Sequence, residues 1–124
     1  MDFEDTPEDA EFRAETAAWL KENGVPKLSD QSMAIRRSCR ARKWNTKKFE
    51  GGFAGISLPK KYGGRGGSRL QQIIFNQEEP NYAVPPNIFS ISYGMAVPTL
   101  MTYATEEQKQ ELVAATLKGD NIWC

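Results

Sequence analysis

Apolar residues recur at helical spacing in several segments of this chain, and glycine or proline separates the segments. In the first segment, Thr6 and Pro7 precede two acidic residues, which is typical of a helix start because the hydroxyl caps backbone N–H groups. Gly24 then provides a stop, so the pattern predicts a helix over residues 7–23. Its apolar face comprises Phe12, Thr16, Trp19 and Leu20.

Residues 31–50 lack proline and glycine and are rich in helix formers, which predicts a second helix. Gly51 and Gly52 end this helix. A mostly irregular segment, called the crossing below, follows over residues 53–68. We expect its apolar residues to lie beneath neighbouring helices. These residues are Phe53, Ile56, Leu58 and Tyr62.

Two capping boxes mark further helix starts, because each pairs a hydroxyl residue with a glutamine three positions later. Ser68 with Gln71 predicts a helix that reaches about Glu79, and Thr105 with Gln108 predicts one that ends at Lys118. No hairpin pattern is present. The sequence therefore predicts an all-α fold, a bundle of about four to six helices.

Residues 80–105 form a run of 26 residues without a charge. Several prolines and polar residues interrupt the run, so it does not read as a membrane span. We interpret it as buried helix, because a helix surrounded by protein needs no charged face. The expected elements are a helix from Asn87 to Val97 and a second from Pro98 to Ala104, with Pro98 at a first helical position or a kink.

Composition limits the function classes. The chain has 124 residues, a formal net charge of zero and no histidine, which excludes serine–histidine triads and histidine-containing metal sites. The two cysteines, Cys39 and Cys124, make neither a zinc motif nor a disulfide framework, so a reducing, cytoplasmic setting fits best. The acidic start resembles neither a secretory signal nor a transit peptide and is typical of a native bacterial N-terminus.

Charge is nevertheless segregated along the chain. Residues 1–30 hold nine acidic and three basic residues, whereas residues 31–69 hold one acidic and eleven basic residues. A basic helical stripe with Trp44 nearby is one hypothesis for a nucleic-acid site; its members are Arg36, Arg40, Lys43 and Lys47. The neutral net charge and the lack of a known binding module favour a solvated face, or pairing with the acidic first helix, so we expect no nucleic-acid partner.

Two other features invite a chemical interpretation. The loop "LPKKYGGRGGS" precedes a helix, where glycines can present N–H groups to an anion, but it lacks the lysine of a phosphate-binding loop. Glu78 and Glu79 are adjacent carboxylates, yet neighbouring helical residues point about 100° apart and cannot share a proton. We interpret both features as structural.

Three segments in order carry a family resemblance: "GFAGISLPKKYGGRGGS", "IIFNQEE" and "VPTLMTYATEEQKQELVAATLKGDNIWC". Together they resemble the N-terminal helical domain of acyl-CoA dehydrogenases. The resemblance implies that residues 1–121 form this domain and that residues 122–124 begin the flavin-binding β-domain. It also implies that the Gly-rich loop is a structural crossing.

The resemblance further implies a flavoprotein oxidoreductase of fatty acid and lipid metabolism. In the family, a glutamate removes the α-proton of an acyl-CoA thioester while FAD accepts a hydride from the β-carbon. Electron-transfer flavoprotein accepts the electrons, and the subunits form dimers or tetramers. We expect no catalytic, flavin-binding or metal-binding residue within these 124 residues, and we expect the chain alone to be inactive.

The same resemblance places part of the acyl-chain pocket on the uncharged helix. The matching positions are Asn87, Ser90, Ile91 and Gly94. Spacing alone favours ordinary core for these residues. An alternative function is a stand-alone helical interaction module that pairs with a complete subunit and is not itself an enzyme.

Overall fold

The structure is a computed structural model that describes residues 4–24, 35–85 and 87–123. Its first three helices are α1 (Pro7–Asn23), α2 (Ile35–Glu50) and α3 (Arg69–Glu78), and short one-turn segments lie at Lys60–Tyr62 and Glu79–Asn81. The described residues contain no strand, which confirms the all-α prediction. Residues 31–34 of the predicted second helix lie outside the described part.

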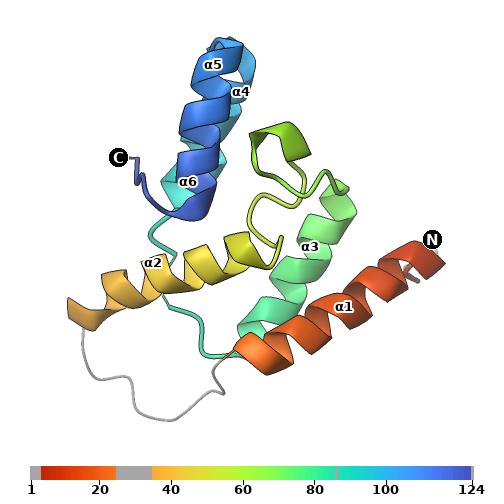
Figure 1. Cartoon of the computed structure of the whole chain (residues 1–124). Coiled ribbons are helices and arrows are strands. Elements are labelled where there is room, and N and C mark those ends of the chain that lie inside the picture. The colour runs from red at the N-terminus through yellow and green to blue at the C-terminus, as the bar shows by residue number, and fades with distance from the viewer. Residues whose placement is uncertain (1–3, 25–34, 86, 124) are drawn as a thin grey trace.

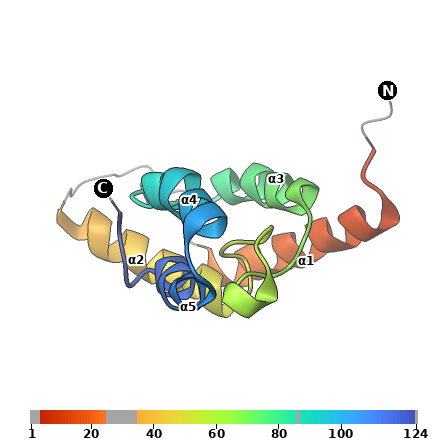
Figure 2. The ribbon, with the colours of Figure 1, turned by 90° about the horizontal axis from the view of Figure 1, so that it is seen from above.

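Two further helices each combine α and π segments. One joins Ser92–Ala96 to α4 (Val97–Tyr103), with helical backbone over residues 90–103, and is called the 90–103 helix below. The other joins α5 (Glu106–Gln108), Lys109–Val113 and α6 (Ala114–Lys118) and is called the 106–118 helix. The two lie against each other at one end of the molecule (Figure 1). From above, α3 and α4 lie on one side, and α1, α2 and α5 on the other (Figure 2).

The helix starts follow the predicted capping residues. The Thr6 hydroxyl accepts a hydrogen bond from the backbone N–H of Asp9, and α1 runs over the predicted residues. Reciprocal capping boxes form between Ser68 and Gln71 and between Thr105 and Gln108. These starts are set locally, since each cap satisfies N–H groups within its own first turn.

Two apolar clusters hold the helices together. One contains Phe12 and Leu20 of α1, Ile74 and Phe75 of α3, and Phe53 with Ile56 from the crossing. The other joins the crossing to the paired helices through Tyr62, Val97, Val113 and Leu117. The prediction that the crossing lies beneath helices is confirmed for Phe53, Ile56 and Tyr62, which are buried. Leu58 is half-buried.

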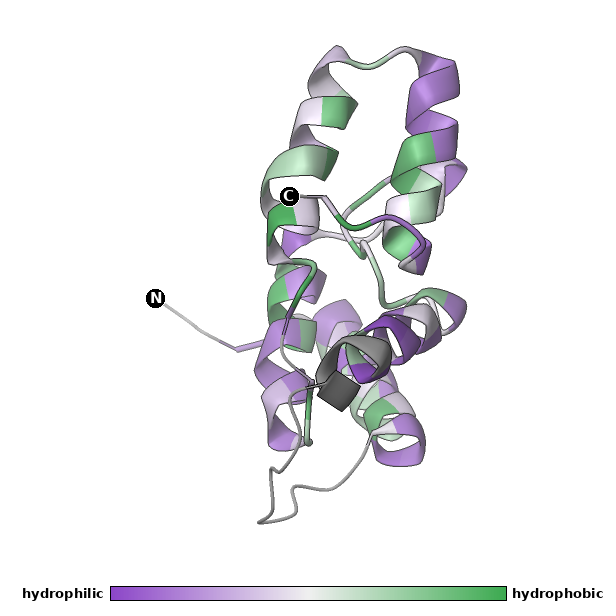
Figure 3. Ribbon diagram, turned by 90° about the vertical axis from the view of Figure 1, so that its left-hand side faces the viewer, coloured by the Kyte–Doolittle hydropathy of each residue, from purple (hydrophilic) through white to green (hydrophobic). Residues whose placement is uncertain are grey.

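The uncharged run differs from its prediction in three respects. Helical backbone begins at Ser90, three residues after the predicted start at Asn87. Residues 90–103 form one helix through Pro98, where two helices were predicted; Ser92–Ala96 is π-helical, and the widened turns accommodate a proline that has no N–H to donate. The helix is also not buried on all sides, because Ile91 is 48% exposed and Met95 67%. In Figure 3 this helix, at the upper left, is mostly pale and green, whereas the 106–118 helix beside it carries purple, hydrophilic residues.

The C-terminal segment folds back onto the paired helices. The backbone N–H of Trp123 donates to the Ser92 hydroxyl at 3.0 Å, and its indole N–H donates to the Thr116 hydroxyl at 2.9 Å. Ser92 and Thr116 are both fully buried. The last described residues therefore fix the relative position of the 90–103 and 106–118 helices.

Within the described residues, no helix is both long and apolar enough to cross a membrane.

Candidate functional site

The Gly-rich loop uses its own backbone donors. The N–H groups of four consecutive residues bond to carbonyls of the preceding turn; these residues are Gly64, Arg65, Gly66 and Gly67. A Cβ atom at Gly64 would lie 2.2 Å from the Leu58 carbonyl oxygen, so this close approach requires glycine. Because these donors are already bonded, the loop offers no cradle of free N–H groups to a phosphate. The interpretation of the loop as a structural crossing agrees with this geometry.

Arg65 of the Gly-rich loop also has its interaction partners within the fold. The Arg65 guanidinium lies 5.0 Å from the ring centres of both Phe12 and Phe53, and it pairs with the Glu15 carboxylate at 2.5 Å. Stacking on aromatic faces and a carboxylate partner are both favourable for an arginine. Arg65 therefore joins the loop to α1.

The two adjacent glutamates have separate partners. Glu78 pairs with Arg13 of α1 at 3.0 Å. Glu79 pairs with Lys48 of α2 at 3.1 Å and accepts a 2.7 Å hydrogen bond from the Trp44 indole. Each carboxylate thus connects the end of α3 to a different helix, which agrees with a structural role.

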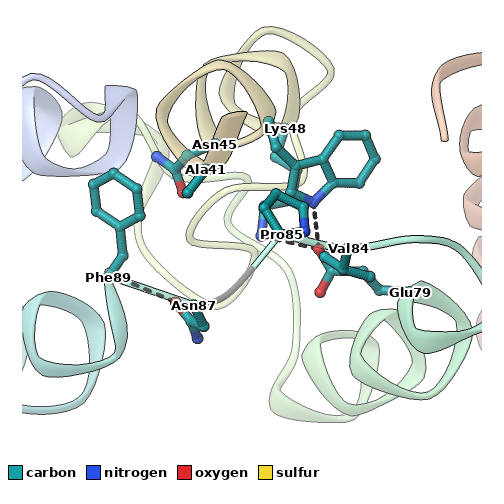
Figure 4. A pocket seen from close by; sticks show the side chains of 9 residues that line it. Ala41, Asn45, Lys48, Glu79, Val84, Pro85, Asn87 and Phe89 are labelled. Atoms are coloured by element: carbon teal, nitrogen blue, oxygen red, sulfur yellow. Dashed lines mark hydrogen bonds and ion pairs between the residues drawn. The ribbon is translucent and has the colours of Figure 1, made fainter. Parts of the chain in front are cut away.

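Glu79 also lines a small pocket between α2 and the segment that leads to the 90–103 helix (Figure 4). The pocket has a volume of about 50 Å³, and its lining comprises Ala41, Trp44, Asn45, Lys48, Glu79, Val84, Pro85, Asn87 and Phe89. Ligand pockets usually enclose about 300–1,000 Å³. This pocket is too small for a flavin ring or a long acyl chain. Among the described residues, no group of three acidic or sulfur ligands is placed to hold a metal ion.

Three of the four residues matched to an acyl pocket lie on the exposed side of the 90–103 helix. Ser90 and Gly94 are exposed, as is Ile91. A Cβ atom built at Gly94 meets no other atom within 4 Å, so the surface is open at this point. Met95 extends the same side by one residue. Ser90, Ile91, Gly94 and Met95 together are called the uncharged face below.

The fourth matched residue, Asn87, has a different position. It lies at the small pocket, and its side-chain oxygen accepts a 3.1 Å hydrogen bond from the N–H of Phe89, just before the helix begins. The structure thus brings Ser90, Ile91 and Gly94 together but leaves Asn87 at the entry of the helix. Met95 was missed by the sequence analysis, although its place four residues after Ile91 on an uncharged helix was an available signal.

The opposite side of the helix is anchored by buried polar groups. The Tyr93 hydroxyl donates to the Asn45 side-chain oxygen of α2 at 2.8 Å. Burial raises the pKa of Tyr93 to about 12, so the phenol stays neutral and keeps its donor proton at physiological pH. Together with the Ser92–Trp123 bond, this contact holds the uncharged face in a fixed orientation.

Comparison with known proteins relates the whole arrangement to one enzyme family. Residues 6–120 match the family model of the acyl-CoA dehydrogenase N-terminal domain. The acyl-CoA dehydrogenase IpdE1 of Mycolicibacterium smegmatis is 27% identical over 92% of this chain and 31% of its own length.

Solved structures give the same result for the fold. The ChsE4–ChsE5 complex of Mycobacterium tuberculosis superposes with a TM-score of 0.70 and 26% identity over 97% of this chain and 30% of that chain. A steroid ACAD, Tcur3481–Tcur3483, superposes with a TM-score of 0.70 and 28% identity over 98% of this chain and 32% of that chain. The chain therefore spans about a third of the length of these relatives. With a family model that covers residues 6–120, the chain belongs to the acyl-CoA dehydrogenase family and corresponds to its N-terminal helical domain.

Proposed function

We propose that this chain acts as the N-terminal domain of a flavin-dependent acyl-CoA dehydrogenase, and that its uncharged face forms one wall of the acyl-chain pocket. One observation carries the proposal: an exposed, uncharged helix face, open at Gly94, lies on a helix that is anchored from behind by Tyr93. Ile91 and Met95 expose apolar side chains on this face, which is the chemistry that an acyl-pocket wall requires. An acyl chain is an occupant of matching chemistry.

The remaining parts of the reaction are assigned to segments outside these 124 residues. FAD would accept the hydride, and we propose that other domains of the enzyme hold it, as the family membership of this chain suggests. We propose that residues 122 and 123 lead toward the flavin-binding β-domain, and that a glutamate beyond this chain removes the α-proton. Electron-transfer flavoprotein would reoxidise the flavin of a cytoplasmic dimer or tetramer.

The substrate class is proposed from the relatives and from Gly94. One structural neighbour is a steroid ACAD at 28% identity, which favours a bulky acyl group over a straight fatty chain. An open surface at Gly94 leaves space for such a group. We therefore propose a ring-bearing or branched acyl-CoA thioester as substrate.

The test uses the native polypeptide that carries these residues, purified from its source. Its intact mass shows whether the chain continues into further domains. Anaerobic mixing with acyl-CoA thioesters should then bleach the absorbance of the oxidised flavin and yield the 2-enoyl product. A native polypeptide without flavin that copurifies with a complete dehydrogenase subunit would instead support the stand-alone interaction module.

A further inference from the structure

Ser92 is the buried residue within the turn that carries the uncharged face. It follows the exposed Ile91 directly and lies two positions before Gly94 in the sequence. Its side chain is fully buried, and a buried hydroxyl is tolerated where it has a hydrogen-bond partner. The partner is the backbone N–H of Trp123, at 3.0 Å. The buried side of the 90–103 helix is therefore bonded to the segment that follows the 106–118 helix.

The backbone of this turn is uncommon. Ser92–Ala96 is π-helical, and it includes Gly94 and Met95, which are two of the four residues of the uncharged face. π-helical turns are rare and are frequent at functional sites. Glycine is also a poor helix former. The turn therefore has little intrinsic stability, so its position depends on contacts from other elements.

Two consecutive residues of the turn provide such contacts. The Tyr93 hydroxyl donates to Asn45, which is fixed within α2. The Ser92 hydroxyl accepts from Trp123, and here the partner is of a different kind. Residues 121–123 have no regular secondary structure, and the segment folds back beside α6 (Figure 1). The position of this segment and the position of the turn therefore depend on each other.

Trp123 is held between two buried hydroxyls. Its backbone N–H donates to Ser92, and its indole N–H donates to Thr116 of α6 at 2.9 Å. Both acceptors are fully buried, so loss of either bond leaves a buried polar group without this partner. The two acceptors differ in place, because only Ser92 lies on the helix that carries the uncharged face.

We propose that Ser92 is a positioning residue for the acyl-pocket wall. Its bond to Trp123 sets the position of the π-helical turn, and the position of this turn determines which acyl groups the uncharged face accepts. The inference rests on the acyl-wall function proposed above. Ser92 acts through the turn and does not itself touch the substrate. Because coupling between two sites is reciprocal, an acyl group that fits the face should in turn stabilise the bond between Ser92 and Trp123.

A purely structural serine would behave differently. Loss of its hydroxyl would lower the stability of the fold and leave the relative affinities for different acyl groups unchanged. A positioning residue also changes these relative affinities. The informative quantity is therefore the ratio of the Kd values for two ligands, a ring-bearing and a straight-chain alkyl-CoA thioether. Such thioethers lack the carbonyl that acidifies the α-proton, so they bind without reacting.

The experiment measures both Kd values by calorimetry on the native polypeptide and its variants. Ser92→Ala removes the acceptor of the Trp123 N–H and should change the Kd ratio by about fivefold or more. Ile74→Val is the matched control, because Ile74 is buried in the other apolar cluster, on α3. It should lower the melting temperature and leave the Kd ratio unchanged.

Amide hydrogen exchange at Trp123 provides a second readout, which does not depend on the Kd ratio. In the parent, the thioether that binds more tightly should slow exchange of this amide more than the other thioether does. In Ser92→Ala, exchange should be fast with and without ligand. A parent-like Kd ratio in Ser92→Ala, or exchange at Trp123 that neither thioether slows in the parent, overturns the proposal.

Gly94→Leu in the same set separates this inference from the function on which it rests. If Gly94→Leu shifts the Kd ratio and Ser92→Ala does not, the uncharged face is an acyl wall and the positioning role of Ser92 is wrong. If neither variant shifts the ratio, the acyl-wall function fails as well.

Discussion

The side-chain amide of Asn45 donates a 2.7 Å hydrogen bond to the carbonyl oxygen of Leu117, which lies 72 positions away in the sequence. The carbonyl belongs to the last turn of α6, where no helical N–H group remains to satisfy it. The Asn45 side-chain oxygen accepts the Tyr93 hydroxyl at 2.8 Å. One buried side chain from α2 therefore joins the end of the 106–118 helix to the back of the uncharged face.

Removing this amide should destabilise the fold. Asn45→Ala removes the 2.7 Å bond to the Leu117 carbonyl and the 2.8 Å acceptor of the Tyr93 hydroxyl, and leaves only the longer 3.3 Å bond from Tyr93 to Leu117, which costs about 1–2 kcal/mol of unfolding free energy. Denaturant unfolding measures the change. Asn76→Ala is the matched control, because Asn76 is exposed and should change stability by less than about 0.5 kcal/mol. Equal effects of the two substitutions would contradict the role of Asn45.

Two buried threonines should respond in opposite directions to the same substitution. Thr16 is fully buried, and its hydroxyl has no hydrogen-bond partner among the described residues. Thr16→Val removes an unsatisfied polar group without changing the shape, so we expect an increase in stability of about 1 kcal/mol.

Thr116 provides the comparison, since its hydroxyl donates to the Leu112 carbonyl and accepts from the Trp123 indole. Thr116→Val should lower the unfolding free energy by about 1–2 kcal/mol. Thermal or denaturant unfolding of both variants checks the pair of predictions. If Thr16→Val were the more destabilising change, the hydroxyl of Thr16 would have a partner that the described structure does not show.

The sequence was informative where structure depends on neighbours along the chain. Three helix starts could be predicted from their capping residues, Thr6, Ser68 and Thr105. This was possible because a capping side chain bonds to N–H groups within the first turn of its own helix. The family resemblance rested on similarly local segments and is confirmed.

Features that depend on contacts between residues far apart in the sequence could not be predicted in this way. An absence of charge over residues 80–105 indicated burial, yet the exposure of Ile91 and Met95 depends on which elements lie against that helix. The bond from Asn45 to Leu117 depends on how α2 crosses the 106–118 helix. Helical spacing predicts which residues share a face of a helix, but it does not predict which elements pack against that face. The sequence therefore indicated the helix that carries the proposed acyl wall, but not the side of this helix that is exposed.

Acid should weaken the contact between the crossing and the 106–118 helix. The buried Tyr62 hydroxyl lies 2.9 and 2.8 Å from the two carboxylate oxygens of Glu106 and donates its single proton to this carboxylate. This bond, with smaller contributions from Lys61 and Lys109, lowers the pKa of Glu106 below its ordinary value of 4.5. A depressed pKa means that the stabilisation is present above about pH 4.5 and is lost as the pH falls through the folded-state value.

The prediction is checked by melting temperatures of the parent and Glu106→Gln between neutral and acidic pH. The variant should be less stable at neutral pH, and the difference should shrink below pH 4.5, where the parent carboxylate becomes protonated. Glu107→Gln is the control, because Glu107 is an exposed neighbour in the same first turn. If the difference in melting temperature between the parent and Glu106→Gln stayed constant across this pH range, the charge of Glu106 would not contribute to stability.

The uncharged face itself is tested at Gly94, in the native polypeptide with its flavin. Gly94→Leu places a branched side chain where nothing lies within 4 Å of an added Cβ atom, so it should fill the proposed acyl wall without disturbing the fold. Each methylene of substrate that loses its buried contact costs about 0.8 kcal/mol, so exclusion of several should shift kcat/KM toward smaller acyl groups by about tenfold or more. Gly94→Ala is the graded control: it adds only one methyl group, should leave the preference nearly unchanged and should raise helix stability by up to about 1 kcal/mol. An acyl-CoA preference that is the same in the parent, the Ala variant and a well-folded Leu variant would remove this helix from the pocket wall.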